Sequence, residues 1–255
     1  HLHVVLRNRP DVAAKWSAEA VARRWLRVFP KRRTKDGEPA RPNDAEVAEI
    51  VGDDRRVAEL RGRLASISWF MKSLNEFIAR RANREDRCRG RFWEGRFKCQ
   101  RLLDETAILT CMAYVDLNPV RAKIAESLED SEFTSAFDRI EARQGRRRVR
   151  RVRKKVQEEG VTLTPRQQKL YENAKKQSKR ARWLARLDAD GSPLSHVSEK
   201  SYLELLDWTG RQLRDDKAGA IPPSVAPILQ QLDINTERWV KTIDRYGSLF
   251  FQIAD

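Results

Sequence analysis

The chain has 255 residues, of which 35% are charged and 40% hydrophobic, which suits a soluble protein with one large domain or two modest ones. No apolar run approaches the roughly 18 to 20 residues of a membrane span, so a membrane-spanning protein is excluded. Lys and Arg outnumber Asp and Glu by 52 to 37, giving a net charge of +15 and a pI near 10.1. Such an excess indicates a polyanionic partner, most simply nucleic acid, although a basic protein without such a partner is the alternative.

The three cysteines, Cys88, Cys99 and Cys111, are odd in number and form no CxxC pair. They predict free thiols in a reducing cytoplasm rather than a disulfide framework or a zinc site.

The first third of the chain predicts a strand followed by short helices. The run HLHVVL (1–6) is typical of a strand, and its period of two places His1 and His3 on one face. Residues 17–29 predict a helix with Ser17 as its N-cap. The stretch 30–44, with three prolines and many charges, predicts a loop, and a short helix is expected over 44–51.

The middle of the chain predicts two helices with an extended segment between them. Residues 64–81 have apolar side chains at three- and four-residue steps, as in an amphipathic helix. The aromatic and basic segment 89–103 predicts a strand or hairpin. Asp104 is expected to cap a helix that ends near Asn118, because Pro119 disfavours helical geometry in the residue before it.

A change in composition follows at about residue 140. Residues 141–186 hold 17 Lys and Arg against 4 Asp and Glu, a net of 17 − 4 = +13. The basic run 145–155 predicts a solvated helix or a flexible arm that follows phosphates. From about 195 onward a compact helical unit is expected, with helices over 202–213, 222–232 and 235–253. Asn235 is the expected N-cap of the last helix.

Two sequence features together suggest phosphodiester chemistry. Tyr114 and Asn118 lie four residues apart, so they project from the same face of the predicted helix. Two imidazoles, from His1 and His3, and a side-chain oxygen can hold a divalent cation. Because that site has no acidic ligand, it stays net positive and polarises a phosphate as a Lewis acid. A tyrosine could then attack, giving a covalent phosphotyrosine that conserves the bond energy for rejoining.

Each feature also has a simpler interpretation. A His-x-His pair on a strand is often incidental, and Tyr114 could be a helix aromatic packed in the core. Asn118 before Pro119 is typical of a helix C-terminal turn. RFWEGRFK could be an aromatic hairpin whose solvated face carries Arg91, Arg96 and Lys98.

Three strings in a fixed order carry a resemblance to a known family. They are His1-Leu2-His3, then Trp93-Glu94-Gly95-Arg96-Phe97-Lys98, then Tyr114-Val115-Asp116-Leu117-Asn118-Pro119-Val120-Arg121-Ala122. This order resembles the single-tyrosine HUH transposases, especially the REP-associated kind, over roughly residues 1–135. The LNPVRA string with WxGRFK upstream is far more specific than His-x-His alone.

The resemblance implies a fold and an activity. The fold is α+β, an HUH palm with helices on one face of an antiparallel, ferredoxin-like sheet, followed by a helical C-terminal extension. The implied domains are a catalytic domain at 1–140, a basic arm at 141–190 and a helical unit at 191–255. The implied activity is a metal-dependent DNA transposase that cleaves and rejoins single-stranded DNA near hairpins through a 5′-phosphotyrosine.

The resemblance also assigns residues. Tyr114 matches the nucleophile. His1 and His3 match the ligands of Mg²⁺ or Mn²⁺, and Asn118 falls where relatives place a polar third ligand. The remaining expected DNA contacts are Arg91, Trp93, Arg96, Lys98 and Arg121, of which Trp93 could stack on a base or simply pack.

Two departures from the family pattern stand out. Family members carry a strand–helix–strand segment before the His-x-His strand, so the resemblance implies an N-terminally truncated chain with an incomplete sheet. The position after Arg121-Ala122, usually Gly, is Lys123, which a helix or turn boundary should tolerate.

The expected partner is single-stranded or hairpin DNA, with no membrane, in a cytoplasmic, nucleoid-associated protein; a homodimer is left open. The main rival is a non-catalytic protein that binds hairpin DNA or RNA and derives from such a transposase. A replication initiator or relaxase with the same chemistry fits the LNPVRA context less well.

Overall fold

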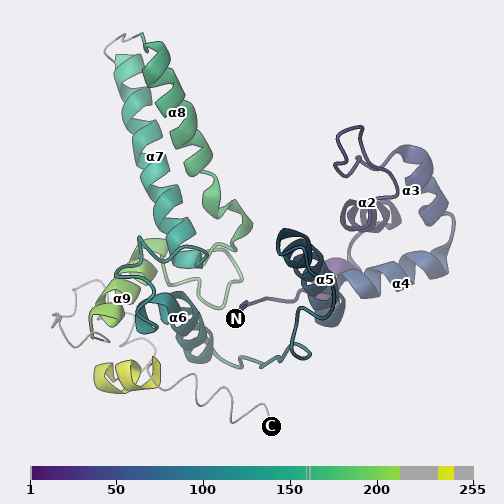
Figure 1. Cartoon of the computed structure of the whole chain (residues 1–255), viewed down its shortest axis with the longest axis horizontal. Coiled ribbons are helices and arrows are strands. Elements are labelled where there is room, and N and C mark those ends of the chain that lie inside the picture. The colour runs from purple at the N-terminus through teal and green to yellow at the C-terminus, as the bar shows by residue number, and fades with distance from the viewer. Residues whose placement is uncertain (1, 159, 161, 213–234, 244–255) are drawn as a thin grey trace. The chain divides into compact units, whose positions relative to one another are not determined.

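The computed structural model describes residues 2–158, 160, 162–212 and 235–243. The chain divides into two compact units, one comprising Leu6–Lys98 and the other His1–Val5 together with Cys99–Asp255. Figure 1 shows the helices of the two units. Each unit has its own buried core.

The expected α+β palm is wrong. Over the residues that the structure describes, 61% are helical and 1% are in strand, and these residues form no sheet. Among the described residues, β pairing is confined to an isolated antiparallel bridge between Arg33 and Pro39. The structure has no ladder at the expected strand 1–6, of which residues 2–6 are described, or at the expected strand or hairpin 89–103, and both segments are extended or irregular. A strand is stable only when a neighbouring strand satisfies its backbone hydrogen bonds, and none of the described segments provides one.

The Leu6–Lys98 unit is built from five helices, α1 (Pro10–Ala14), α2 (Ala18–Val28), α3 (Asp44–Val51), α4 (Asp54–Leu64) and α5 (Ile67–Glu85). Of these, α2 to α5 begin at a side-chain cap and α1 begins at a proline. The Ser17 hydroxyl accepts from the Ala20 amide, so the expected cap of α2 is confirmed. Asn43 and Glu46 form a reciprocal capping box at the start of α3, where a helix was also expected.

Apolar side chains at helical spacing form the core of this unit. The buried residues of α2, α3 and α4 pack together: Val21, Ala22, Leu26, Val47, Ile50, Val57 and Leu60. The amphipathic pattern correctly predicted α5, although the helix begins after the Ser66 cap and extends to Glu85. Phe70 and Phe77 on α5 are exposed.

The other unit contains α6 (Glu105–Arg121), α7 (Ser135–Glu158), α8 (Pro165–Gln177), the short 3₁₀ helix η1 (Arg180–Trp183) and α9 (Glu199–Gln212). Residues 236–243 are also helical, and the Asn235 side chain caps them by accepting from the Arg238 amide, as expected. The expected helix 222–232 and the end of 235–253 lie outside the described residues. The core joins α6, α7 and α9 through Leu109, Ala113, Leu117, Ala136, Tyr202, Leu205 and Leu206, with Trp239 and Ile243.

The end of α6 differs from the sequence prediction. The helix continues through Pro119 to Arg121, because a proline in the last turn costs one hydrogen bond while the turn still packs into the core. Beyond the Ala122 cap, Lys123 has φ +56°, in the left-handed region. The Lys123 amide donates to the Val120 carbonyl, and the Ile124 amide donates to the Pro119 carbonyl, which is a Schellman ending. Lys123 therefore fills a position that favours glycine.

The helices α7 and α8 form an antiparallel hairpin, which contains the basic run 145–155 in helical form (Figure 1). Their backbones meet at Gly145. A Cβ atom there would lie 2.9 Å from the Ala174 carbonyl oxygen and closer still to the Ser178 nitrogen, so the crossing requires glycine.

None of the helices in the described part of the chain combines the length and the hydropathy that crossing a membrane requires. No disulfide joins Cys88, Cys99 and Cys111, of which Cys111 is buried and the other two are exposed.

Candidate functional site

Helix α6 presents Tyr114, Asn118 and Arg121 on its partly exposed side. The Asp104 side chain caps the helix as expected, accepting from the Ala107 amide at 2.7 Å. One face of α6 is buried against the core. Tyr114, Asn118 and Arg121 follow at steps of four and three residues on another face and are half-buried.

The structure brings His3 to Tyr114. Their ring centroids are 6.3 Å apart and the rings stand edge to face at 83°. The two residues are 114 − 3 = 111 positions apart in the sequence, so this proximity results from tertiary folding. His1, the other expected metal ligand, lies outside the described residues.

Arg121 completes a cluster around the phenol. Its guanidinium carbon lies 4.9 Å from the centre of the Tyr114 ring, within the range of a cation–π interaction. We call these three side chains the His3–Tyr114–Arg121 cluster. A positive group beside the phenol stabilises negative charge on the phenol oxygen or on a bound phosphate.

The structure describes two of the three metal ligands expected from the sequence, His3 and Asn118. Burial lowers the pKa of His3, which favours the neutral imidazole, and the neutral form is the one that binds metal ions. Asn118 lies one helical turn beyond Tyr114 and provides an amide oxygen. An imidazole and an amide oxygen fit a divalent cation. Within the described residues, no three His, Cys, Asp or Glu side chains group into a metal site.

The same helix carries a buried carboxylate, Asp116, that the sequence pattern did not predict as a functional residue. Asp116 is 1% exposed. Its Oδ1 accepts from the Ser135 and Ala136 amides at 2.9 and 3.2 Å. Its Oδ2 accepts from the Ser135 and Tyr202 hydroxyls at 2.7 and 2.8 Å. Asp116 thus caps α7 from a distance of nearly twenty residues, and no local pattern in the sequence announces that role.

Burial dominates the electrostatics of this network. It raises the pKa of Asp116, although hydrogen bonds from Ser135, Tyr202 and Ala136 act in the opposite direction. Burial and the neighbouring Asp116 carboxylate raise the pKa of Tyr202, so its phenol stays protonated and donates. The network fixes α6, and with it Tyr114, against α7 and α9.

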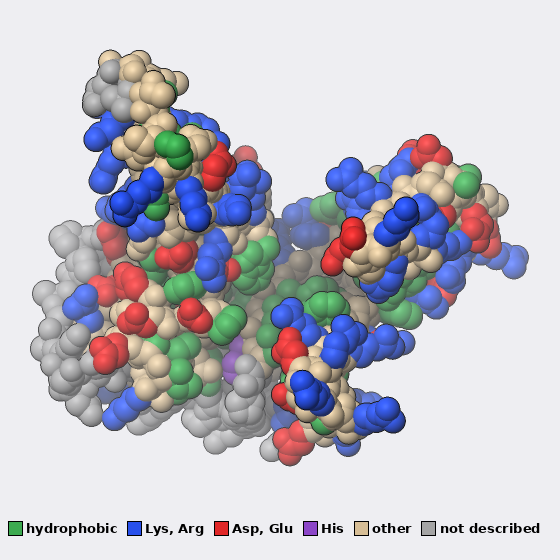
Figure 2. All heavy atoms as spheres, turned by 45° about the horizontal axis from the view of Figure 1, so that its top comes forward, with side chains coloured by type: hydrophobic (Ala, Val, Ile, Leu, Met, Phe, Trp, Pro, Cys, Tyr) green, Lys and Arg blue, Asp and Glu red, His purple; other side chains and the backbone are tan. Residues whose placement is uncertain are grey.

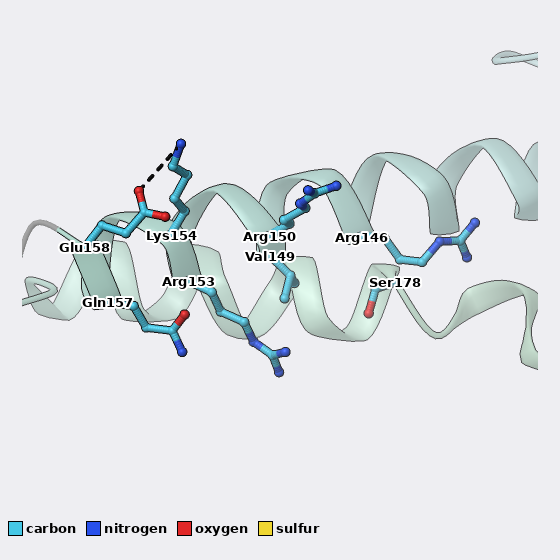
Figure 3. Close-up of a pocket in the computed structure, with 8 residues that line it drawn as sticks. All are labelled: Arg146, Val149, Arg150, Arg153, Lys154, Gln157, Glu158 and Ser178. Carbon is cyan, nitrogen blue, oxygen red and sulfur yellow. Dashed lines mark ion pairs between the residues drawn. The ribbon is translucent and has the colours of Figure 1, made fainter.

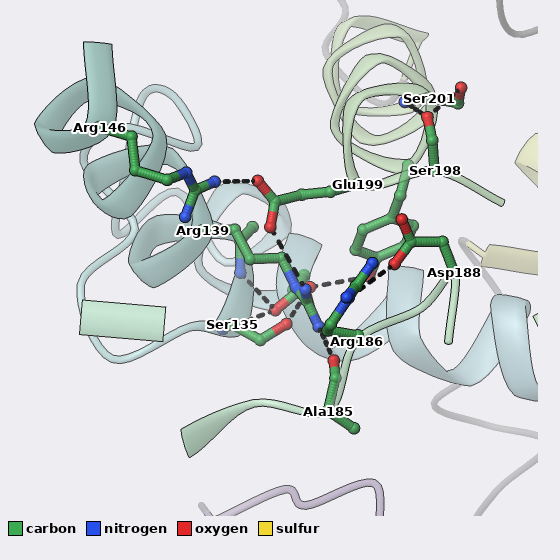
Figure 4. A network of polar contacts seen from close by, with 12 residues as sticks. Ser135, Arg139, Arg146, Ala185, Arg186, Asp188, Ser198, Glu199 and Ser201 are labelled. Carbon is green, nitrogen blue, oxygen red and sulfur yellow. Dashed lines mark hydrogen bonds and ion pairs between the residues drawn. The ribbon is translucent and has the colours of Figure 1, made fainter. Parts of the chain in front are cut away.

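A second network holds the base of α7. The buried Arg139 and the exposed Arg146 share the Glu199 carboxylate on α9, at N–O distances of 3.8 and 2.6 Å (Figure 4). Arg139 also donates to the Ala185 carbonyl at 3.1 Å. Because a buried guanidinium needs a compensating partner, Glu199 is the residue that makes Arg139 tolerable there.

The expected DNA contacts Arg91, Trp93, Arg96 and Lys98 belong to the Leu6–Lys98 unit. The Trp93 indole donates to the Asn75 carbonyl at 2.9 Å, and the Arg91 guanidinium donates to the Trp93 carbonyl at 2.9 Å. Trp93 therefore packs against α5. The Arg96 and Lys98 side chains are exposed.

No family model matches this chain, and neither a curated protein nor a solved structure matches it. The resemblance to single-tyrosine HUH transposases therefore stays a prediction from the three sequence strings.

Proposed function

We propose that this chain is a transposase that cleaves and rejoins single-stranded DNA near hairpins through a covalent 5′-phosphotyrosine on Tyr114. The observation that supports the proposal is the approach of His3 to Tyr114, since an imidazole beside a phenol brings together the two side chains that this chemistry requires. The partner is DNA, in a cytoplasmic, nucleoid-associated protein. A homodimer stays a prediction, which a measurement of the molar mass in solution would test.

The reaction uses Tyr114 as the nucleophile. Its phenol oxygen attacks the phosphorus, the bond from phosphorus to the 3′ oxygen breaks, and the phenol proton leaves to solvent or base while the freed 3′ oxygen takes up a proton. Arg121, over the ring, stabilises the developing negative charge. Rejoining is the reverse attack by a 3′-hydroxyl.

His3, His1 and Asn118 would hold a divalent cation, Mg²⁺ or Mn²⁺. When bound, such an ion polarises the phosphate and favours attack by a weak nucleophile. Burial lowers the pKa of His3, which favours the neutral imidazole that binds metal ions.

The experiment is a covalent-adduct assay. The full chain is incubated with a labelled single strand carrying a hairpin and with Mn²⁺ or Mg²⁺, then analysed in SDS. A DNA–protein adduct should form and should vanish in Tyr114→Phe, while Tyr171→Phe, which changes another tyrosine, should retain it. His3→Ala should reduce the yield by at least about tenfold.

A second candidate is a nucleic-acid-binding protein without strand cleavage, which the excess of positive charge favours. Tight binding of the oligonucleotide without any adduct, in either metal, would contradict cleavage and favour this candidate.

A further inference from the structure

One face of α7 carries a row of cations along a groove. The groove, of about 630 Å³, runs beside α7 and reaches Ser178 just beyond the end of α8 (Figure 3). Its cations are Arg146, Arg150, Arg153 and Lys154, which we call the cationic track, and the groove contains one carboxylate, Glu158, among its described lining residues. Their charges sum to 4 − 1 = +3.

The spacing of the cationic track follows from the helix. Arg146, Arg150 and Lys154 recur every four residues, which places a positive group on the same face at intervals of about 6 Å. Arg153 points toward α8 (Figure 3). Its guanidinium donates to the Tyr171 hydroxyl of α8 at 3.2 Å. A polyanion lying along α7 would therefore meet a basic side chain at each turn. Of these, Arg146 is paired with Glu199 at 2.6 Å. Lys154 is paired with Glu158 at 3.5 Å (Figure 3), so a bound phosphate would share both cations with those carboxylates.

The charge continues toward the base of the hairpin. A second groove of about 340 Å³ shares Arg146 and Ser178 with the first and adds Arg139, Arg182 and Arg186. Its carboxylates are Asp188 and Glu199, so its described lining residues leave 4 − 2 = +2. Lys and Arg side chains are gathered over the α7–α8 hairpin in the space-filling view (Figure 2).

The lining chemistry distinguishes between polyanionic partners. Of the described lining residues of the first groove, Val149 alone is apolar, and none is aromatic. Proteins that hold unpaired bases usually provide aromatic rings on which the bases stack, whereas contacts to a stacked duplex go to phosphate oxygens. A membrane-surface helix would instead present a broad apolar face beside its cations.

We propose that the cationic track on α7 binds the sugar–phosphate backbone of double-helical nucleic acid. The inference goes beyond strand cleavage at Tyr114 and does not depend on it. Binding is independent of base sequence, and it weakens with salt because counterions are released from the phosphates.

The test compares two pairs of substitutions in the Tyr114→Phe chain, in which no tyrosine adduct can form. Arg150→Gln with Lys154→Gln removes two cations of the track. Arg147→Gln with Arg151→Gln is the matched control, since both residues are exposed on the same helix with the same spacing but do not line the groove. Circular dichroism confirms that both double variants keep their helices.

Affinity for a labelled 20-base-pair DNA duplex of arbitrary sequence is measured between 50 and 200 mM salt. The track pair should weaken binding by about tenfold near 100 mM salt and reduce the slope of log K against log salt by about 2, while the control pair changes affinity by less than about threefold. Affinity for duplex RNA of the same sequence is measured in parallel. Tighter binding of either duplex supports the proposal and shows whether the track prefers DNA or RNA.

Three results would overturn the proposal. The first is an equal loss in both double variants, which would show an effect of net charge alone. The second is a loss of affinity for the corresponding single strand, caused by the track pair, as large as the loss for the duplex. The third is displacement of the duplex by phosphatidylserine vesicles at matched negative charge, which would assign the surface to a membrane.

Discussion

The Tyr202 hydroxyl donates a 2.8 Å hydrogen bond to the Asp116 carboxylate, across 86 positions of the sequence. The same carboxylate receives two backbone amides at the start of α7, so α6, α7 and α9 meet at one buried side chain. A buried acceptor that satisfies several donors stabilises chiefly by preventing those donors from being left without partners.

Two substitutions at Asp116 should separate the contribution of its hydrogen-bond acceptor from that of its charge. Asp116→Ala leaves the Ser135 and Ala136 amides buried without this acceptor, and we expect the free energy of unfolding to fall by about 2 to 3 kcal/mol. Asp116→Asn keeps the acceptor for both amides, while its NH₂ can donate to the two hydroxyls, so a loss below about 1 kcal/mol is expected. Urea denaturation followed by circular dichroism measures both, and equal losses would contradict a capping role.

At Gly145, where α7 and α8 cross, replacing glycine by alanine should have the opposite effect to the one usual in helices. Alanine in place of glycine normally stabilises a helix by up to about 1 kcal/mol. Gly145→Ala should instead destabilise the chain by about 1 to 3 kcal/mol, because its Cβ would overlap the backbone of Ala174 and Ser178. Gly62→Ala, in α4 with open space around it, is the control and should be neutral or stabilising in the same denaturation experiment.

The left-handed residue after α6 offers a stabilising substitution. Lys123 has φ +56°, where a side chain costs about 1 to 2 kcal/mol that glycine avoids. Since glycine loses more chain entropy on folding, Lys123→Gly should raise the free energy of unfolding by about 0.5 to 1 kcal/mol. Lys123→Ala keeps the Cβ and serves as the control. A gain with alanine as large as that with glycine would contradict the backbone explanation.

A paramagnetic metal should report on the His3–Tyr114–Arg121 cluster without any reaction. If His3 holds a divalent cation, Mn²⁺ should broaden the Tyr114 ring signals in an NMR spectrum, because the two rings lie 6.3 Å apart. Tyr114→Phe assigns those signals, and chelation with EDTA should restore them. His3→Ala should abolish the broadening, and its persistence in that variant would place the ion elsewhere.

Local sequence signals predicted local structure well. Ser17, Asp104 and Asn235 cap the helices that they were expected to cap, because a capping side chain acts within three residues of its own position. The predicted strands failed for the opposite reason. Residues 1–6 and 89–103 carry extended, aromatic and β-branched patterns, but a strand depends on a partner elsewhere in the chain, which a local pattern cannot specify.

The same distinction holds for the candidate site. Helical periodicity alone placed Tyr114 and Asn118 on one helix face. Arg121 joins that face only because α6 continues to Arg121, beyond the end expected near Asn118. The role of Asp116, in the same motif, was not predicted, because the groups that donate to its carboxylate come from residues 19 to 86 positions away in the sequence. The approach of His3 to Tyr114 was expected from a family resemblance, although the sheet that the resemblance implied is absent from the described residues.

The anchors of the α7–α8 hairpin are all at one end. Ser135 contacts Asp116, and Arg139 and Arg146 contact Glu199, all in the first half of α7. Farther along α7, Arg148 and Arg153 donate to Gln177 and Tyr171 of α8. In the part of the chain that the structure describes, the outer turns of the hairpin therefore make no contact on which the packing of α6 against α9 depends. These turns could be exchanged for a short loop, or lengthened by whole turns, while the foundation on α6 and α9 keeps its shape.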